Sequence, residues 1–289
     1  MPMPYRILEN PDGSVDLLLF PSPDAEWAAE LRPGRMLKKL GEQKRILCVR
    51  AVKIVAAGGI VLSIPFSSLA TRTQKDNYAM SYIYFGTAAQ QIQNALAAAD
   101  VLDVISPSYF DLNADGSLKL NAVSDRFIST MKANGIKVVP FLSNHWDRAS
   151  GVAALKNAEA LSTQIADAVS RYGLDGVNVD IENVTASERQ LYVDFVRLLR
   201  QKIPAGKEVS VAVAANPSGW TAGWHGSYDY AALARYADHL FIMAYDEHYS
   251  GGPAGPVAGY PFVQKSIEYA LQYVPKEKIV RSEERRVGK

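Results

Sequence analysis

Two carboxylates stand two positions apart at the end of an apolar segment of the sequence. Residues 174–182 read Leu-Asp-Gly-Val-Asn-Val-Asp-Ile-Glu. On a β-strand Asn178, Asp180 and Glu182 would share one face, because side chains alternate along a strand. The Cα atoms of Asp180 and Glu182 would then lie roughly 6 to 7 Å apart, and neighbouring carboxylates raise each other's pKa. We therefore expect Glu182, at the strand end, to donate a proton near neutral pH and Asp180 to stabilise charge.

The segments around this strand indicate the fold that positions it. Strand-like runs occur at 82–85, 101–109, 136–142, 174–181, 208–214 and 239–245. Amphipathic helical stretches lie between them at 88–99, 125–134, 151–172, 187–203, 228–237 and 262–273. Such an alternation requires a parallel sheet with helical crossovers, either open or closed into a barrel. Since no G-x-G-x-x-G follows the first strand and no G-x-x-x-x-G-K-[ST] occurs, the sequence favours an α/β fold of the (β/α)8 TIM-barrel type.

The polar face of residues 178–182 fits the interior of such a barrel only if its groups are paired or functional. In a barrel the reacting groups stand at the carboxyl ends of the strands. The alternative is a solvated strand edge with alternating polarity, which suits an antiparallel sheet better than a parallel sheet buried on both faces.

The run that ends at Glu182 resembles, position by position, the signature of glycoside hydrolase family 18, the chitinase-like barrels. A second element agrees, because Met243-Ala244-Tyr245-Asp246 resembles the Met-x-Tyr-Asp motif of that family. The similarity extends over roughly residues 82–280. It is strongest to the bacterial branch that contains spore-associated and cell-wall N-acetylglucosaminidases.

The resemblance implies cleavage of β-1,4-linked N-acetylglucosamine polymers, either peptidoglycan or chitin, with retention of configuration. Glu182 would protonate the glycosidic oxygen while the acetamido oxygen of the substrate attacks the anomeric carbon. Asp180 would orient that acetamido group, and Tyr245 would hydrogen-bond its carbonyl. No metal or organic cofactor is needed. The alternatives are a non-catalytic chitinase-like lectin, which usually lacks the acid, and a barrel enzyme of different chemistry.

The predicted substrate contacts come partly from the resemblance and partly from aromatic residues near strand ends. The resemblance assigns Asn178, Met243 and Asp246 to the sugar site. Aromatic rings present large faces to a ligand, and we expect sugar contacts from Tyr109, Trp146, Trp220 and Trp224. The alternative for each ring is that it anchors its own loop. His145 and His225 have neither an i, i+4 partner nor a third ligand, so we expect no metal site.

The N-terminal part of the chain has a different character. Residues 54–70 carry no charge, and seven Lys or Arg residues precede them between Arg35 and Lys53 with only Glu42 in opposition. This pattern predicts a signal or membrane anchor at 46–70 and therefore an exported protein of the cell envelope, membrane-anchored or secreted. The alternative is a buried core element. Residues 1–45 would form an extension with a short hairpin around Asn10-Pro11-Asp12-Gly13.

Composition and length set the remaining expectations. The 289 residues include one Cys, which excludes an intramolecular disulfide framework. The 31 Lys and Arg residues nearly balance the 30 Asp and Glu residues, which argues against nucleic acid binding. We expect a monomer. Residues 281–289 resemble a translated sequencing-library adapter, a non-native tail, although a natural basic tail is the alternative. The barrel domain, 71–280, would then hold about six strand–helix units. We therefore expect an incomplete barrel that folds poorly or stays open.

Overall fold

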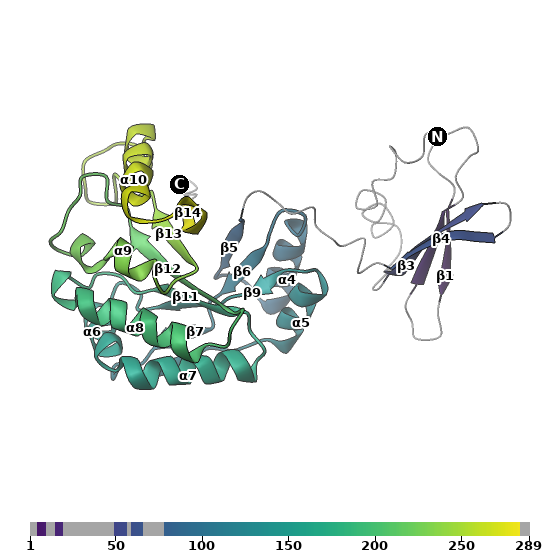
Figure 1. Ribbon diagram of the computed structural model, residues 1–289, viewed down its shortest axis with the longest axis horizontal. Coiled ribbons are helices and arrows are strands. Elements are labelled where there is room, and N and C mark those ends of the chain that lie inside the picture. Colours follow the sequence, from purple (N-terminus) through teal and green to yellow (C-terminus); the bar gives the residue numbers. More distant parts are fainter. Residues whose placement is uncertain (1–4, 10–14, 20–48, 57–58, 66–77, 284–289) are drawn as a thin grey trace. The chain divides into compact units, whose positions relative to one another are not determined.

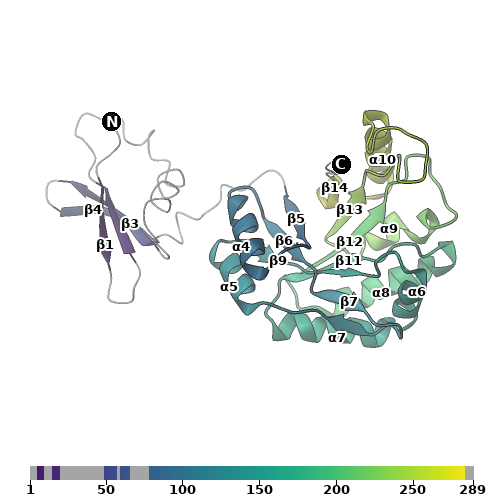
Figure 2. The same cartoon turned by 180° about the vertical axis from the view of Figure 1, so that it is seen from behind.

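The computed structural model describes residues 5–9, 15–19, 49–56, 59–65 and 78–283. The chain divides into two compact units, Met1–Asn77 and Tyr78–Lys289. The two units are drawn from opposite sides in Figure 1 and Figure 2. The sequence places the start of the barrel domain at residue 71, whereas the division in the structure falls between Asn77 and Tyr78.

The first unit contains one four-stranded sheet in the order β1-β2-β3-β4. Its strands are β1 (Tyr5–Glu9), β2 (Val15–Leu19), β3 (Val49–Ala56) and β4 (Gly59–Pro65). The first two strands pair antiparallel from Tyr5↔Leu19 to Glu9↔Val15. The turn predicted between them at Asn10-Pro11-Asp12-Gly13 lies outside the described residues. The second and third strands pair in parallel, and the third and fourth pair antiparallel.

The signal or membrane anchor predicted at 46–70 is not supported by the structure. Strands β3 and β4 occupy most of that segment, and residues 46–48, 57–58 and 66–70 lie outside the described part. Among the described residues, no helix combines the length and the apolar character that crossing a membrane requires. The segment is rich in Val and Ile, and β-branched residues favour extended backbone over helix. Export to the cell envelope stays a prediction.

The second unit is built around parallel strands that belong to two sheets, one of seven strands and one of three. Its parallel strands are β5 (Met80–Ile83), β6 (Val104–Pro107), β9 (Lys137–Val138), β10 (Phe141–Ser143), β11 (Gly176–Asp180), β12 (Glu208–Ala214), β13 (His239–Met243) and β14 (Ile279–Ser282). Strands β9 and β10 come from one predicted strand, which Val139 and Pro140 interrupt. A hairpin of β7 (Phe110–Leu112) and β8 (Leu118–Leu120) adds to the edge of β10. All six predicted strands are therefore present.

Helices cover the outer faces of these two sheets (Figure 1). They are α4 (Ala88–Ala97), α5 (Asp125–Ala133), α6 (Arg148–Lys156), α7 (Ala158–Arg171), α8 (Arg189–Lys202), α9 (Tyr230–Leu233) and α10 (Tyr260–Tyr273). Three short 3-10 turns are η1 (Ala186–Glu188), η2 (His225–Ser227) and η3 (Lys276–Lys278). The apolar face of β11, with Val177, Val179 and Ile181 fully buried, joins the core formed by these helices. Burial on both faces is what a parallel sheet requires.

The end of the second unit differs from the sequence expectation. Arg281 and Ser282, assigned to a non-native tail at 281–289, extend β14 and pair with Ile242 and Met243 of β13. The strand accommodates them because its backbone hydrogen bonds do not depend on side-chain type. Within the described part of the chain, β5 and β14 each pair with a strand on one side only. The incompleteness of the barrel stays a prediction.

Candidate active site

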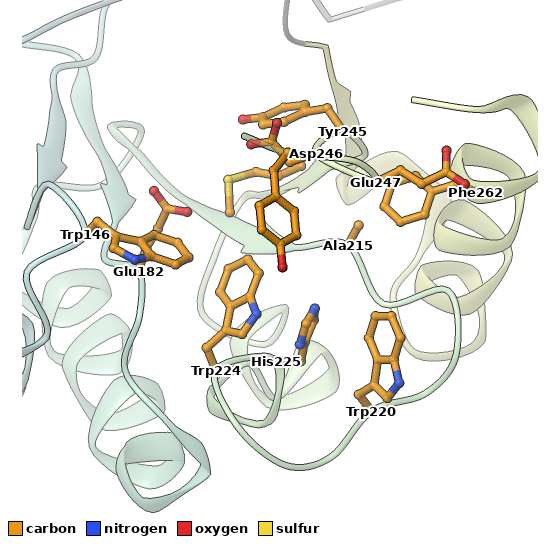
Figure 3. Close-up of a pocket in the computed structure, with 12 residues that line it drawn as sticks. Trp146, Glu182, Ala215, Trp220, Trp224, His225, Tyr245, Asp246, Glu247 and Phe262 are labelled. Atoms are coloured by element: carbon orange, nitrogen blue, oxygen red, sulfur yellow. The ribbon is translucent and has the colours of Figure 1, made fainter. Parts of the chain in front are cut away.

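A cavity of about 680 Å³ opens at the carboxyl ends of β10 to β13. Parallel strands bring these ends together, so loops distant in sequence meet at one place. The cavity is lined by Trp146, Glu182, Ala215, Trp220, Trp224, His225, Met243, Tyr245, Asp246, Glu247, Tyr249 and Phe262. Figure 3 shows how the side chains of ten of these residues face the cavity. Seven of the twelve lining residues were predicted from the sequence to bind or cleave a sugar, namely Met243 and the six residues Trp146, Glu182, Trp220, Trp224, Tyr245 and Asp246.

The two carboxylates of the strand signature lie at the end of β11 and just beyond it. Asp180 ends β11 and Glu182 follows two positions later at the cavity. Burial, and after it the nearby charges of Asp180 and Asp246, together raise the pKa of Glu182 to about 8. Burial also raises the pKa of Asp180, to about 6, against the opposing influence of His145. Because its pKa lies near 8, the carboxyl group of Glu182 is protonated at neutral pH and can donate its proton to a bound molecule.

The backbone of Glu182 is held by a side chain from the neighbouring strand. Asn144, which follows β10 and is 3% exposed, accepts a hydrogen bond from the Glu182 amide at 2.8 Å and donates to the Glu182 carbonyl at 2.8 Å. The preceding carbonyl, that of Ile181, accepts bonds from the hydroxyls of Tyr192 and Tyr228, each at 3.1 Å. Three elements other than β11 thus fix the peptide from which the proposed acid projects.

The loops at this end of the sheet contain residues with left-handed backbone. Positive φ angles occur at His145 (47°), Trp146 (65°), Asn183 (58°) and Asp246 (59°). For residues other than glycine, this conformation costs on the order of 1–3 kcal/mol each. The side-chain amide of Asn183 donates to the Trp146 carbonyl at 2.9 Å and so joins the loops after β10 and β11. Such local strain is typical of functional sites, where the surrounding structure enforces it.

An aromatic wall, formed by Trp146, Trp220, Trp224 and His225, borders the cavity (Figure 3). Trp224 contacts Trp146 edge to face at 5.2 Å between ring centroids, and His225 lies between Trp220 at 4.5 Å and Trp224 at 4.6 Å. Trp146 is 51% exposed and Trp220 is 46% exposed, so both present ring faces to a ligand. Burial lowers the pKa of His225. The sequence analysis discussed His225 only as a possible metal ligand and did not predict its position in this aromatic wall.

Two of the predicted substrate contacts are corrected by the structure. Tyr109 is 4% exposed and packs edge to face against Phe127 of α5, within the hydrophobic core. The chain turns after β6, with the Tyr109 amide bonded to the Pro107 carbonyl, and this turn directs the ring toward the helices. Asn178 is fully buried on the inner face of β11, where it accepts from the Tyr82 hydroxyl at 2.8 Å and donates to Ser210 at 3.0 Å. It supports the strand from below the cavity.

The remaining predicted residues come from the end of β13. Met243, Tyr245 and Asp246 all line the cavity. Burial, and after it the nearby Asp180 and Tyr245, raise the pKa of Tyr82. The sequence analysis did not identify Glu247 and Tyr249, which follow the Met-x-Tyr-Asp motif in the loop after β13, or Phe262 in the first turn of α10, because no motif includes them.

A metal-assisted site is not among the arrangements seen. Within the described ranges, no group of three or more His, Cys, Asp or Glu side chains is placed to hold a metal ion. The chemistry that the observed groups support is proton transfer from a half-buried carboxyl group beside an aromatic surface.

Comparison with known proteins places these features in a family. The family model described as "Glycosyl hydrolases family 18" matches residues 80–283. YdhD of Bacillus subtilis, named as a sporulation-specific glycosylase, is 39% identical over 121 residues, which are 42% of this chain and 29% of that protein. The cortical fragment-lytic enzyme of Bacillus subtilis is 34% identical over 122 residues, 42% of this chain and 28% of that protein. The chain therefore aligns with less than a third of the length of these two curated relatives.

Solved structures agree on the fold. The Bacillus cereus spore cortex-lytic enzyme SleL superposes with a TM-score of 0.65 at 22% identity, over 71% of this chain and 50% of that chain. A chitinase from Chromobacterium violaceum superposes with a TM-score of 0.63 at 25% identity, over 70% of this chain and 67% of that chain. The parallel α/β fold is thus shared with known barrel structures.

Proposed function

The chain belongs to the glycosyl hydrolases of family 18, and from this membership we propose that it cleaves β-1,4-linked N-acetylglucosamine polymers, peptidoglycan or chitin, by substrate-assisted retaining hydrolysis. The relatives named above support both polymers, since two are named for the spore cortex and one as a chitinase. The observation that carries the proposal is the half-buried Glu182 side chain at the cavity, whose pKa is raised to about 8.

In the first step Glu182 gives its proton to the glycosidic oxygen as the bond from that oxygen to the anomeric carbon breaks. The acetamido oxygen of the same sugar attacks the anomeric carbon and forms an oxazolinium ring. In the second step water attacks the anomeric carbon, the ring opens, and the Glu182 carboxylate takes the proton from that water. Two displacements at one carbon give net retention of configuration.

The neighbours of Glu182 supply positioning and charge. Asp180, partly ionised at neutral pH, stabilises the positive charge of the oxazolinium and orients the acetamido group. Tyr245, at the same cavity, donates a hydrogen bond to the acetamido carbonyl oxygen, and Asp246 contacts the sugar. The aromatic wall offers ring faces against which neighbouring sugars stack.

The test compares the wild type with Glu182→Gln on chitin oligomers and on purified peptidoglycan. We expect turnover to fall by about 10²- to 10⁴-fold, because the amide cannot transfer a proton, while binding is retained. Binding is measured by tryptophan fluorescence, since three tryptophans line the cavity. Glu277→Gln, a matched change at an exposed residue of η3, is the control. Unchanged turnover in Glu182→Gln would remove the acid role, and binding without cleavage by the wild type would favour a lectin.

A further inference from the structure

None of the ionisable side chains that line the cavity in the described part of the chain carries a positive charge near pH 7. Glu182, Asp246 and Glu247 contribute carboxyl groups, and the lining residues in the described part of the chain include no Lys or Arg. His225 does not supply a cation at neutral pH, because burial lowers its pKa below the ordinary value of 6.5. The guanidinium of Arg189 bonds the Gly226 carbonyl at 2.6 Å, behind the wall and not at the cavity.

Glu247 is the carboxylate of this set with a fixed place away from the reaction. Figure 3 shows Glu247 beside Phe262, on the opposite side of the cavity from Glu182. Its Oε2 accepts a hydrogen bond from the Gly259 amide at 2.7 Å, and Gly259 is the N-cap residue of α10. The positive end of the helix dipole stabilises a negative charge there.

The backbone near Gly259 is adapted to this carboxylate. A Cβ atom at position 259 would lie 2.6 Å from Glu247 Oε2, so glycine leaves the space that the side chain needs. The Glu247 amide also bonds the Val257 carbonyl at 3.0 Å, which holds the loop in place. Glu247 is therefore a fixed anion in the wall of the binding cavity.

We propose that Glu247 makes the cavity selective for uncharged N-acetylhexosamine rings over rings that carry a carboxylate, such as muramic acid with a free lactyl group. This inference rests on the proposed function, because it names the substrate class of the same site. Aromatic ring faces bind the apolar faces of uncharged sugars, whereas a substrate carboxylate near Glu247 meets a like charge in a partly desolvated cavity. Muramic acid whose carboxyl is capped as an amide or lactam belongs to the accepted class.

The test uses one glycan in two charge states. Peptide-free glycan strands with free lactyl carboxylates are compared with the same strands after capping as methylamides. For the wild type we expect Kd, from tryptophan fluorescence, to be about fivefold or more lower for the capped strands at low salt, and kcat/KM to favour them similarly. In Glu247→Gln the ratio falls toward one, because the amide oxygen still accepts from Gly259 but carries no charge.

The controls separate this inference from the proposed function. Glu277→Gln, exposed and remote from the cavity, should leave the ratio at the wild-type value. The wild-type ratio should also shrink in 1 M salt, where the Debye length falls to about 3 Å, and this holds as a test even if Glu247→Gln fails to fold. Equal affinity for both strands, or an unchanged ratio in a folded Glu247→Gln, overturns the inference. Absence of cleavage with a normal binding ratio would instead overturn only the hydrolase activity.

Discussion

Replacement of Asn144 tests whether a neighbouring strand positions the proposed acid. Its side chain makes three hydrogen bonds of 2.8 Å, to the Glu182 amide, the Glu182 carbonyl and the Asp147 carbonyl. At a net contribution of about 1 kcal/mol per bond, Asn144→Ala should lower the free energy of unfolding by about 3 kcal/mol. Because the freed peptide carries Glu182, kcat should fall as well, by about 10²-fold for a displacement near 1 Å.

Two further variants also test whether Asn144 positions Glu182. Asn144→Asp keeps the acceptor for the Glu182 amide but turns a negative oxygen toward two carbonyls. Its stability should therefore be lowest at neutral pH and recover on acidification, when the new carboxyl group gains a proton to donate. Gly151→Ala, on α6, should displace the Asn144 side chain while leaving Asn144 itself unchanged, because the added Cβ would lie 2.8 Å from its Nδ2.

The assay is urea unfolding followed by circular dichroism, combined with kcat on a chitin oligomer. Asn157→Ala is the matched control, since Asn157 precedes α7 without a side-chain capping bond, and it should change stability by less than about 1 kcal/mol. If Asn144→Ala unfolds within about 0.5 kcal/mol of the wild type and keeps its kcat, then the paired bonds do not position Glu182 and the reasoning fails.

Other predictions concern titration. Turnover should decline above about pH 8, because Glu182 then loses its proton. In Asp180→Asn the decline should begin at lower pH, because the negative charge that raises the pKa of Glu182 is gone. A decline at the same pH in both proteins, measured as kcat against pH, would contradict the interaction between the two carboxyl groups. Burial raises the pKa of Glu208, but the neighbouring His239 imidazole, 3.5 Å away, and the Tyr78 hydroxyl, which donates to it at 2.8 Å, outweigh this effect and lower the pKa below 4.5. Glu208→Gln should therefore cost most stability above pH 4.5, and the difference should shrink as the pH falls through the lowered pKa; urea unfolding with a pH-independent difference would contradict it.

Much of the second unit could be predicted because its signals are local. The run that ends at Glu182 carries its alternation, its burial and its chemistry within nine residues, and the structure places that run on β11 with Val177 and Val179 buried. The segment 46–70 shows the opposite case. An uncharged apolar run suits a membrane helix and a strand equally, and only pairing partners distant in sequence decide between them. Strand β2 is such a partner for β3.

Tyr109 and Glu247 show why the site itself was only partly predictable. Both stand shortly after a strand, where a barrel collects its functional residues. Tyr109 nevertheless turns into the core, and Glu247 turns to the cavity because the amide of Gly259, twelve residues later, binds its carboxylate. Proximity to a strand end identifies candidates, but the direction of each side chain depends on the contacts that its loop makes.

The position of Glu182 depends on the same kind of contact. The motif contains Glu182, which we propose as the proton donor, yet the peptide at 181–182 is held by Asn144, Tyr192 and Tyr228, none of which belongs to the motif. A chain that retains the motif but loses these partners would keep the right functional group and misplace it. The proposed activity should therefore require these neighbouring contacts as well as the carboxylates, and the Asn144 variants measure that requirement separately from the proposed acid.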